Sequence, residues 1–153
     1  MSALTVRAVT EVDAGQLPPL FEALSHSATV DQLRVRLARL CSDPLYEAWV
    51  AADQAGLLVG FAAGHLVFPV EDDTPAAQLI ALVCAPTARG QGVGTMLCAA
   101  FEEWAVHHGA TRAVLTSSAE RSDAHAFYMQ RGYAASGTRF SKTFASQDQV
   151  LQA

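Results

Sequence analysis

Residues 84–95 mark the change from a strand to a helix, and their sequence is CAPTARGQGVGT. The apolar run 79–84 that leads into them predicts a buried strand. Gly90, Gly92 and Gly94 let the backbone approach a ligand closely and direct successive N–H groups into one concavity. The N-terminus of the following helix adds about half a positive charge. Strand, glycine-rich loop and helix together predict a site for a phosphate or diphosphate group.

Two familiar phosphate-binding loops do not match this segment. The P-loop ends in Gly-Lys-Ser/Thr, whereas Gly94 is followed by Thr95 and Met96. The dinucleotide fingerprint G-x-G-x-x-G fails because the three glycines of the loop are spaced two residues apart. The acidic residue that would hold a ribose about twenty positions further on is also missing. The loop therefore points to another class of phosphate site.

Hydrophobic periodicity on both sides of the loop predicts alternating strands and helices. Upstream it predicts a strand at 5–8, a first helix split near Leu17 by Pro18-Pro19, a helix capped by Thr29, and a hairpin of 48–52 and 57–67. Downstream it predicts a helix from Val93 to Gly109, a strand at 113–116, a helix over 123–131 ended by Gly132, and a final extended segment over 134–144. This order predicts an α/β domain with a mixed sheet.

The composition limits the class of protein. The chain has 153 residues, of which 51% are hydrophobic and 16% charged, so it suits one folded domain and excludes disorder. No apolar run approaches the ~20 residues that a membrane span requires. The formal net charge of −5 gives no field that would attract nucleic acid or anionic lipid. Neither of these two kinds of partner is expected.

The cysteines and the N-terminus indicate a compartment. Cys41, Cys84 and Cys98 are odd in number, widely spaced and set in apolar contexts, which is typical of buried, reduced thiols. Residues 1–7 lack the basic and apolar regions of a secretory signal. The sequence therefore predicts a cytoplasmic protein.

Two motifs carry a resemblance to a known family. Leu82, Cys84 and Pro86, followed by RGQGVG at 89–94, resemble motif A of the GNAT superfamily of acetyl-CoA-dependent N-acetyltransferases. About thirty residues on, AHAFY at 124–128 and RGY at 131–133 resemble its motif B. The resemblance covers Leu4 to Phe144.

The resemblance implies a fold and a domain. It implies a mixed, mostly antiparallel sheet of six to seven strands with helices on both faces. A single acetyltransferase domain would then occupy residues 1–153, with its core at about 4–144 and a polar tail at 145–153. Acetyl-CoA would be the co-substrate.

The resemblance also assigns roles to residues. The strand at 82–84 would splay from its neighbour and pair with pantetheine amides, and amides from Arg89 through Thr95 would bind the pyrophosphate. Tyr128 would protonate the leaving thiolate, which suits a phenol because it stays protonated at neutral pH; a buried aromatic residue is the alternative. The implied cofactor contacts are Leu82, Val83, Cys84, Arg89, Gly90, Gln91, Gly92, Val93, Gly94, Thr95, Arg121, Phe127, Tyr128 and Arg131.

Motif B departs from the family pattern at one position. Arg121 stands where the family usually has Asn. Its side chain would either reach a phosphate or stabilise a turn, and both alternatives stay open.

The sequence leaves the general base open. Many relatives place a carboxylate on the strand before motif A, but Gln78, Ile80 and Ala81 cannot act as bases. The remaining candidates are Glu71, Asp72, Asp73, Glu120 and His65. Glu71 and Asp72 would serve as the base or attract a cationic amine, or else form a solvated acidic turn. A satisfied core histidine is the alternative for His65.

Residues 123–128 and 139–142 look most like those of small-molecule N-acetyltransferases, which include the aminoalkylphosphonate acetyltransferases. Those relatives carry a histidine-rich segment between the third and fourth strands, where this chain matches only at His65, and no metal is expected. The predicted activity is direct transfer of an acetyl group from acetyl-CoA to a primary amine of a small molecule. The alternatives are a catalytically silent acyl-CoA-binding module and a protein or peptide N-acetyltransferase. The apolar final segment leaves a homodimer open.

Overall fold

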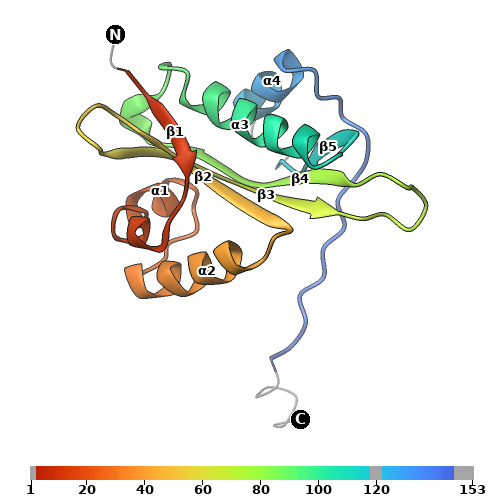
Figure 1. The fold of residues 1–153 in the computed structure, drawn as a ribbon, viewed down its shortest axis with the longest axis horizontal. Coiled ribbons are helices and arrows are strands. Elements are labelled where there is room, and N and C mark those ends of the chain that lie inside the picture. Colours follow the sequence, from red (N-terminus) through yellow and green to blue (C-terminus); the bar gives the residue numbers. More distant parts are fainter. Residues whose placement is uncertain (1–2, 118–121, 147–153) are drawn as a thin grey trace. The chain divides into compact units, whose positions relative to one another are not determined.

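We describe the protein from a computed structural model, in which residues 3–117 and 122–146 are described (Figure 1). The chain divides into two compact units, one that ends at Leu115 and one that begins at Thr116. The expectation of a single acetyltransferase domain over residues 1–153 stays a prediction.

The first unit is built on one sheet of five strands in the order β1-β2-β3-β4-β5. Neighbouring strands are antiparallel except β4 and β5, which are parallel. The strands are β1 (Thr5–Ala8), β2 (Tyr46–Ala52), β3 (Leu58–Val67), β4 (Ala76–Cys84) and β5 (Arg112–Leu115). The expected mixed and mostly antiparallel sheet is confirmed, but six to seven strands was wrong.

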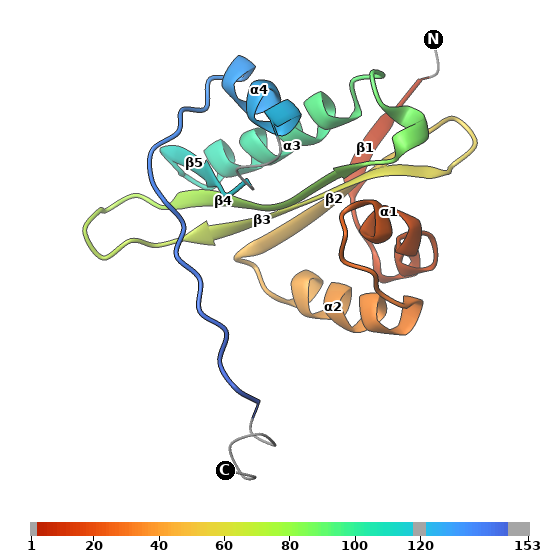
Figure 2. The same ribbon diagram turned by 180° about the vertical axis from the view of Figure 1, so that it is seen from behind.

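Helices cover both faces of this sheet, as expected (Figures 1 and 2). On one face lie a 3-10 helix η1 (Glu11–Gln16), α1 (Pro18–Ala23) and α2 (Val30–Ser42). Their apolar side chains, with Leu33 and Leu37 the most deeply buried of α2, form a core with Val50, Phe61 and Val83 of the sheet. The opposite face carries α3 (Val93–His107), after a short 3-10 helix η2 (Pro86–Ala88).

The break in the first helix falls at Leu17, as the proline pair predicted, since proline cannot donate an interior helical hydrogen bond. Asp13 anchors η1 to the first strand. Its carboxylate accepts two hydrogen bonds of 2.8 Å from the Arg7 guanidinium and one of 2.8 Å from the Thr10 N–H. The bond from Arg7 is the main reason that the pKa of Asp13 lies below its usual value.

Helix α3 lies close to the sheet because two glycines of β3 leave room for it. A Cβ atom at Gly60 would lie 2.5 Å from Val93 Cγ1, and one at Gly64 would lie 2.8 Å from Phe101 Cδ2. The glycines are four residues apart and therefore face the same side of the strand. This close approach fixes where the helix begins, beside the end of β4.

The second unit contains α4 (Ser122–Gln130). Gly132, with φ of +91°, ends the helix as predicted, and the Tyr133 N–H donates to the Tyr128 carbonyl at 3.1 Å. The described residues after it, 133–146, contain no strand, so the expected last strand was wrong. Phe140 and Phe144 are 92% and 82% exposed. An extended segment becomes a strand only when its backbone pairs with another strand, and no such pairing occurs in the described part of this segment.

The cysteines differ in exposure. None of the three forms a disulfide; Cys98 is buried and Cys84 half-buried, but Cys41 is exposed, contrary to the expectation of a buried side chain. No helix within the described residues is long and apolar enough to cross a membrane.

Candidate active site

Strands β4 and β5 part midway along β4. Their pairing begins at Ala76 opposite Arg112 and ends at Leu79 opposite Leu115. The pairing of β4 with β3 shifts at the same level, because Ala63 pairs with Ala81 while Gly64 pairs with Leu79. Ile80 is therefore the extra residue of a β-bulge, which bends a strand and increases its twist. We call the point where β4 leaves β5 the fork.

Beyond the fork, β4 offers backbone groups along a free edge. The Ala85 N–H donates to the Val59 carbonyl at 2.8 Å. In an antiparallel pair every second residue forms hydrogen bonds to the neighbouring strand, so Val83 and Ala81 of β4 form hydrogen bonds to β3. The N–H and C=O groups of Leu82 and Cys84 consequently face the other edge, where β5 no longer pairs. A ligand with amide groups can add to this edge as a strand would.

The glycine-rich loop follows this edge directly. Gly90 and Gly92 have φ of +79° and +84°, a left-handed conformation that other residues adopt only with strain. A Cβ atom at either position would meet no atom within 4 Å, so the loop borders open space. Arg89 is exposed and has no ion-pair partner within the described residues.

The N-terminus of α3 completes this part of the site. Gly92 is its N-cap and supplies no side chain to the helix, and the first turn contains no acidic residue. The first helical bond runs from the Met96 N–H to the Gly92 carbonyl at 3.0 Å. The N–H groups of Val93, Gly94 and Thr95 therefore lack acceptors within the helix and are suited to bind an anion.

The thiol of Cys84 lies within this edge but is not set up as a nucleophile. Its Sγ donates to the Ala85 carbonyl at 3.4 Å, and burial raises the pKa of the thiol. Reactive cysteines have lowered pKa values, because the thiolate is the nucleophile.

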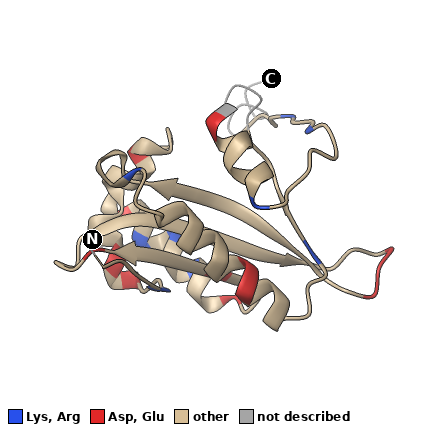
Figure 3. Ribbon diagram, turned by 90° about the horizontal axis from the view of Figure 1, so that it is seen from above, with Lys and Arg blue, Asp and Glu red and all other residues tan. Residues whose placement is uncertain are grey.

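The acidic loop between β3 and β4 lies at the far end of β4 from this edge (Figure 3). Glu71, Asp72 and Asp73 are exposed. Asp72 accepts hydrogen bonds of 3.0 Å from the Thr74 N–H and hydroxyl, which lower the pKa of its carboxyl. Asp72 therefore forms a turn and is a weak proton acceptor.

The second unit holds the motif B residues. Phe127 and Tyr128 of α4 are half-buried, with ring centroids 5.4 Å apart, and Tyr128 lies 5.9 Å from Tyr133. Arg131 is half-buried and its N–H donates to the Tyr128 carbonyl at 3.0 Å. Two other candidates, Glu120 and Arg121, lie outside the described residues.

A row of polar and aromatic side chains crosses the sheet next to the fork, and sequence reasoning did not find it. Tyr46 of β2 pairs with His65 of β3, and His65 pairs with Gln78 of β4. The rings of Tyr46 and His65 stack with centroids 4.1 Å apart and an angle of 13°. Only the alternation of strand residues hints at such a row, because the pairing of distant strands brings its members together.

Comparison with known proteins identifies the chain. A model of the acetyltransferase (GNAT) family matches residues 15–133, which include both motifs. The chain belongs to this family. It is also 37% identical over 87 residues to an aminoalkylphosphonate N-acetyltransferase from Salmonella typhimurium, a match that spans 57% of this chain and 56% of the relative.

Solved structures share the fold of this GNAT protein. A transcriptional regulator from Bacillus halodurans has a TM-score of 0.84 at 24% identity, over 93% of this chain and 100% of that one. Glucosamine-6-phosphate N-acetyltransferase from Arabidopsis thaliana has a TM-score of 0.80 at 17% identity, over 94% and 99% of the two chains. An aminoglycoside N-acetyltransferase in complex with CoA has a TM-score of 0.79 at 18% identity, over 96% and 97%.

The residues of the GNAT protein fit the coenzyme that its family uses. The free edge at Leu82 and Cys84 offers partners for amides, and the loop at 89–95 offers N–H groups for a diphosphate. No group of three or more metal-ligating side chains occurs within the described ranges of the chain.

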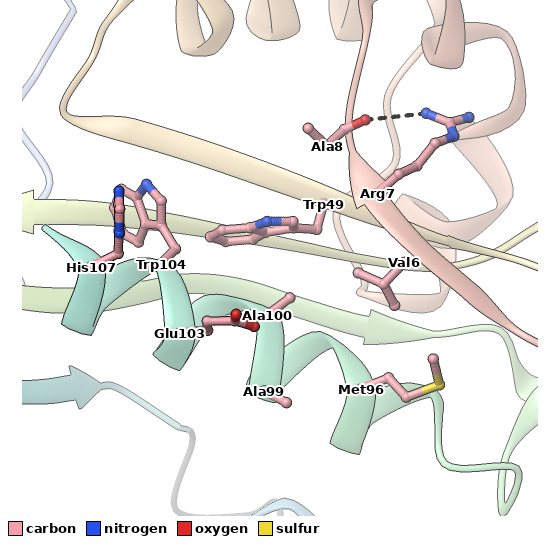
Figure 4. Close-up of a pocket in the computed structure, with 10 residues that line it drawn as sticks. All are labelled: Val6, Arg7, Ala8, Trp49, Met96, Ala99, Ala100, Glu103, Trp104 and His107. Carbon is pink, nitrogen blue, oxygen red and sulfur yellow. Dashed lines mark hydrogen bonds between the residues drawn. The ribbon is translucent and has the colours of Figure 1, made fainter.

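A separate groove lies at the other edge of the sheet, between β1 and α3 (Figure 4). It has a volume of about 640 Å³ and is lined by Trp49, Trp104, Met96 and Glu103 among others. Strand β1 is the edge strand opposite β5, so this groove is separated from the fork by the whole width of the sheet. It is not part of the coenzyme site.

Proposed function

We propose that the protein transfers the acetyl group of acetyl-CoA to a primary amine of a small molecule by direct attack. The observation that carries this proposal is the parting of β4 from β5 immediately before a glycine-rich helix N-terminus. One end of a long ligand can pair with the strand edge while the other, anionic end binds the loop. This combination suits a pantetheine diphosphate.

The loop would hold the diphosphate mainly through backbone groups. Amides from Arg89 to Thr95 would donate to the phosphate oxygens, and each charge-assisted bond contributes on the order of 1.5–3 kcal/mol. Arg89 adds a full positive charge, whereas the chain as a whole has a net charge of −5. Local dipoles therefore take the place of global basicity.

The strand edge would orient the pantetheine arm. Backbone groups of Leu82 and Cys84 would pair with its amides, which is supported by the free edge of the strand there, and Val83 packs in the core. The thioester would then lie toward the fork. For this reason the acceptor amine is expected near the fork.

Tyr128 would supply the proton that the leaving thiolate takes up. The proposal for this residue, and for Phe127, Arg131 and Arg121 as coenzyme contacts, is supported by the match of motif B to the family. A phenol is a suitable donor because it is protonated at neutral pH. The amine nitrogen forms its bond to the acetyl carbon as the carbon–sulfur bond breaks, so no enzyme nucleophile is needed.

Glu71 and Asp72 are proposed to attract a cationic amine rather than to act as the base. Both side chains are exposed on the loop before β4, and Asp72 is held by Thr74. An exposed cluster of like charge raises the local concentration of a counter-ion.

The experiment that tests the activity measures release of free thiol from acetyl-CoA across a panel of small amines, peptides and aminoglycosides. Thiol release that depends on a small amine, with the acetylated amine detected by mass spectrometry, is the expected result. Release with peptides alone would replace the small-molecule substrate by a protein or peptide.

A second candidate function is favoured by one observation. The strand before motif A lacks a carboxylate side chain. The positions where a base would be expected hold Gln78, Ile80 and Ala81. A catalytically silent acyl-CoA-binding module needs no base. Tight binding of acetyl-CoA without turnover on any member of the panel would establish this function instead.

We also propose a cytoplasmic location, which is supported by three cysteines that form no disulfide. A homodimer stays a prediction that light scattering on the purified chain measures directly.

A further inference from the structure

We propose that His65 accepts the proton of the acceptor amine, in an acceptor site that Tyr46 and Gln78 complete on the open face of the sheet. The inference rests on the proposed acetyl transfer and names the base that this reaction requires. It also assigns the substrate class as a small primary alkylamine that is cationic in solution.

The three side chains share one face of the sheet. Phe61 and Ala63 of β3 belong to the core on the α1 and α2 side, whereas Gly60 and Gly64 face α3. Alternation along the strand therefore puts His65 on the α1 and α2 side. Tyr46 and Gln78 are its directly paired neighbours, and paired residues point to the same face.

Within the described residues of the first unit, no helix covers this end of that face, while α3 covers the other face. Leu66, Ala77 and Leu79, which point toward α3, are 4%, 0% and 5% exposed. On the opposite face at the same level, Tyr46, His65 and Gln78 are only half-buried. Ile80, the bulge residue beside them, is 44% exposed. In the first unit, α1 and α2 pack against Val50, Phe61 and Val83, toward the other end of these strands (Figure 2).

The imidazole of His65 has a fixed orientation and free polar atoms. Its ring stacks almost parallel on Tyr46, which sets the plane in which its nitrogens lie. Within the described residues, no hydrogen bond to either ring nitrogen is present. All other residues of β3 from Leu58 to Leu66 are buried, so the half-buried His65 is held by stacking and keeps its ring nitrogens available.

His65 lies close to the place where the thioester is expected. It pairs with Gln78, which is one residue from Leu79, the last residue of β4 that pairs with β5. Paired Cα atoms are about 4.5–5.5 Å apart, and one residue along a strand adds about 3.3 Å. An amine bound over Gln78 and Ile80 can therefore touch both the acetyl carbon at the fork and the imidazole, directly or through one water.

The acidic loop is a poorer source for the base. Asp72 precedes the start of β4 at Ala76, and Leu79 at the fork is a further three residues along the strand. Those three residues alone span about 10 Å. Proton transfer over that distance needs several waters, whereas His65 needs at most one.

The proton balance is complete with this base. The ammonium gives one proton to His65, and the neutral nitrogen then attacks the acetyl carbon. The carbon–sulfur bond breaks and the thiolate takes up one proton, for which Tyr128 is the proposed donor. The nitrogen loses its second proton to solvent, and one proton from solvent restores the donor. His65 releases its proton to solvent. The products are the amide, coenzyme A and one proton.

The test uses amines that differ in their need for a base. His65→Phe keeps an aromatic ring against Tyr46 and removes the proton acceptor. An alkylamine from the active panel is compared with its β,β,β-trifluorinated analogue, which has a similar shape but is largely neutral at pH 7, because three fluorine atoms strongly lower the pKa of the ammonium group. We expect kcat to fall roughly 10²- to 10⁴-fold for the alkylamine and less than about tenfold for the fluorinated analogue.

The control is His26→Phe, the same substitution at an exposed histidine outside the site, which should leave both rates unchanged. Affinity for coenzyme A, measured by calorimetry, should match the wild-type value in both variants. His65→Gln gives a second measurement, with the same expected contrast between the two amines, if the phenylalanine variant does not fold.

The possible results distinguish a failure of His65 as the base from a failure of the proposed acetyl transfer. If the wild-type protein acetylates no amine, the proposed function fails and the inference with it. If the wild type is active but His65→Phe and His65→Gln leave kcat unchanged, or lower it equally for both amines, His65 is not the base and the acetyl transfer stands.

Discussion

The two ends of β4 present different chemical groups to a ligand, main-chain groups at one end and side chains at the other. At its C-terminal end, Leu82 and Cys84 present backbone groups, and the following loop presents backbone N–H groups at glycines. At its N-terminal end, Gln78 lies in a row with Tyr46 and His65, and this row presents side chains. One strand therefore carries a coenzyme edge made of main chain and an acceptor surface made of side chains.

The difference teaches what each end can tolerate. A site made of backbone groups can bind its ligand with many different side chains at its positions, because only the main-chain conformation matters. It therefore depends on glycine and on the packing that fixes the main chain. A side-chain site can change its substrate by single substitutions. The coenzyme end is expected to be shared with relatives, and the acceptor end to distinguish this chain from them.

The largest effect is expected where chemistry depends on one side-chain atom. Tyr128→Phe removes the hydroxyl that is proposed to protonate the thiolate, and kcat should fall roughly 10²- to 10⁴-fold. Affinity for coenzyme A should not change, because the ring remains. Steady-state kinetics and calorimetry measure the two quantities. An unchanged kcat would remove Tyr128 from the mechanism.

The next effect tests the packing that supports the coenzyme end. Gly60→Ala adds a Cβ atom 2.5 Å from Val93 Cγ1 and 2.9 Å from Leu97 Cδ1, at the beginning of α3. The free energy of unfolding should fall by about 1–3 kcal/mol, as in other overpacked cores. Urea denaturation followed by circular dichroism measures it.

The matched control is Gly15→Ala, where an added Cβ atom meets nothing within 4 Å and φ is not in the left-handed region. Its free energy of unfolding should stay within about 0.5 kcal/mol of wild type. Equal losses in the two variants would mean that the close approach of α3 is not what makes Gly60 necessary.

A smaller effect tests whether the loop acts through its main chain. Gly92→Ala forces a residue with a Cβ atom to keep a φ of +84°, at a cost of about 1–2 kcal/mol. If the loop relaxes instead, its N–H groups turn away and affinity for coenzyme A should fall roughly tenfold. Gln91→Ala, at the exposed neighbouring position, should keep the wild-type affinity. A larger loss with Gln91→Ala would make the site one of side chains.

The sequence predicts the coenzyme end far better than the acceptor end. The glycine spacing is a local signal, and the structure has the loop where that signal predicts it. The proline pair beside Leu17 and the N-cap residue Thr29 are also local signals, elsewhere in the chain, and the helix break and the cap are where the sequence predicts them. The stack of Tyr46 on His65 depends on how β2 pairs with β3, which no local signal specifies.

The prediction of a final strand was wrong for a related reason. Residues 134–144 follow the helix end at Gly132, and the sequence predicts an extended backbone for them. Whether that backbone becomes a strand depends on an edge elsewhere, and Phe140 and Phe144 remain exposed. Periodicity reports local conformation and not its partner.

The smallest effect concerns the charge of the loop before β4. Replacing Glu71, Asp72 and Asp73 together by Gln, Asn and Asn removes the exposed acidic cluster without touching the fork. The KM of a cationic amine should rise roughly threefold, because local attraction of the amine is lost, while kcat stays the same. The difference from wild type should vanish at high salt, which screens exposed charges. A fall in kcat at unchanged KM would instead show that this loop takes part in proton transfer. The base would then be an acidic residue of the loop and not His65.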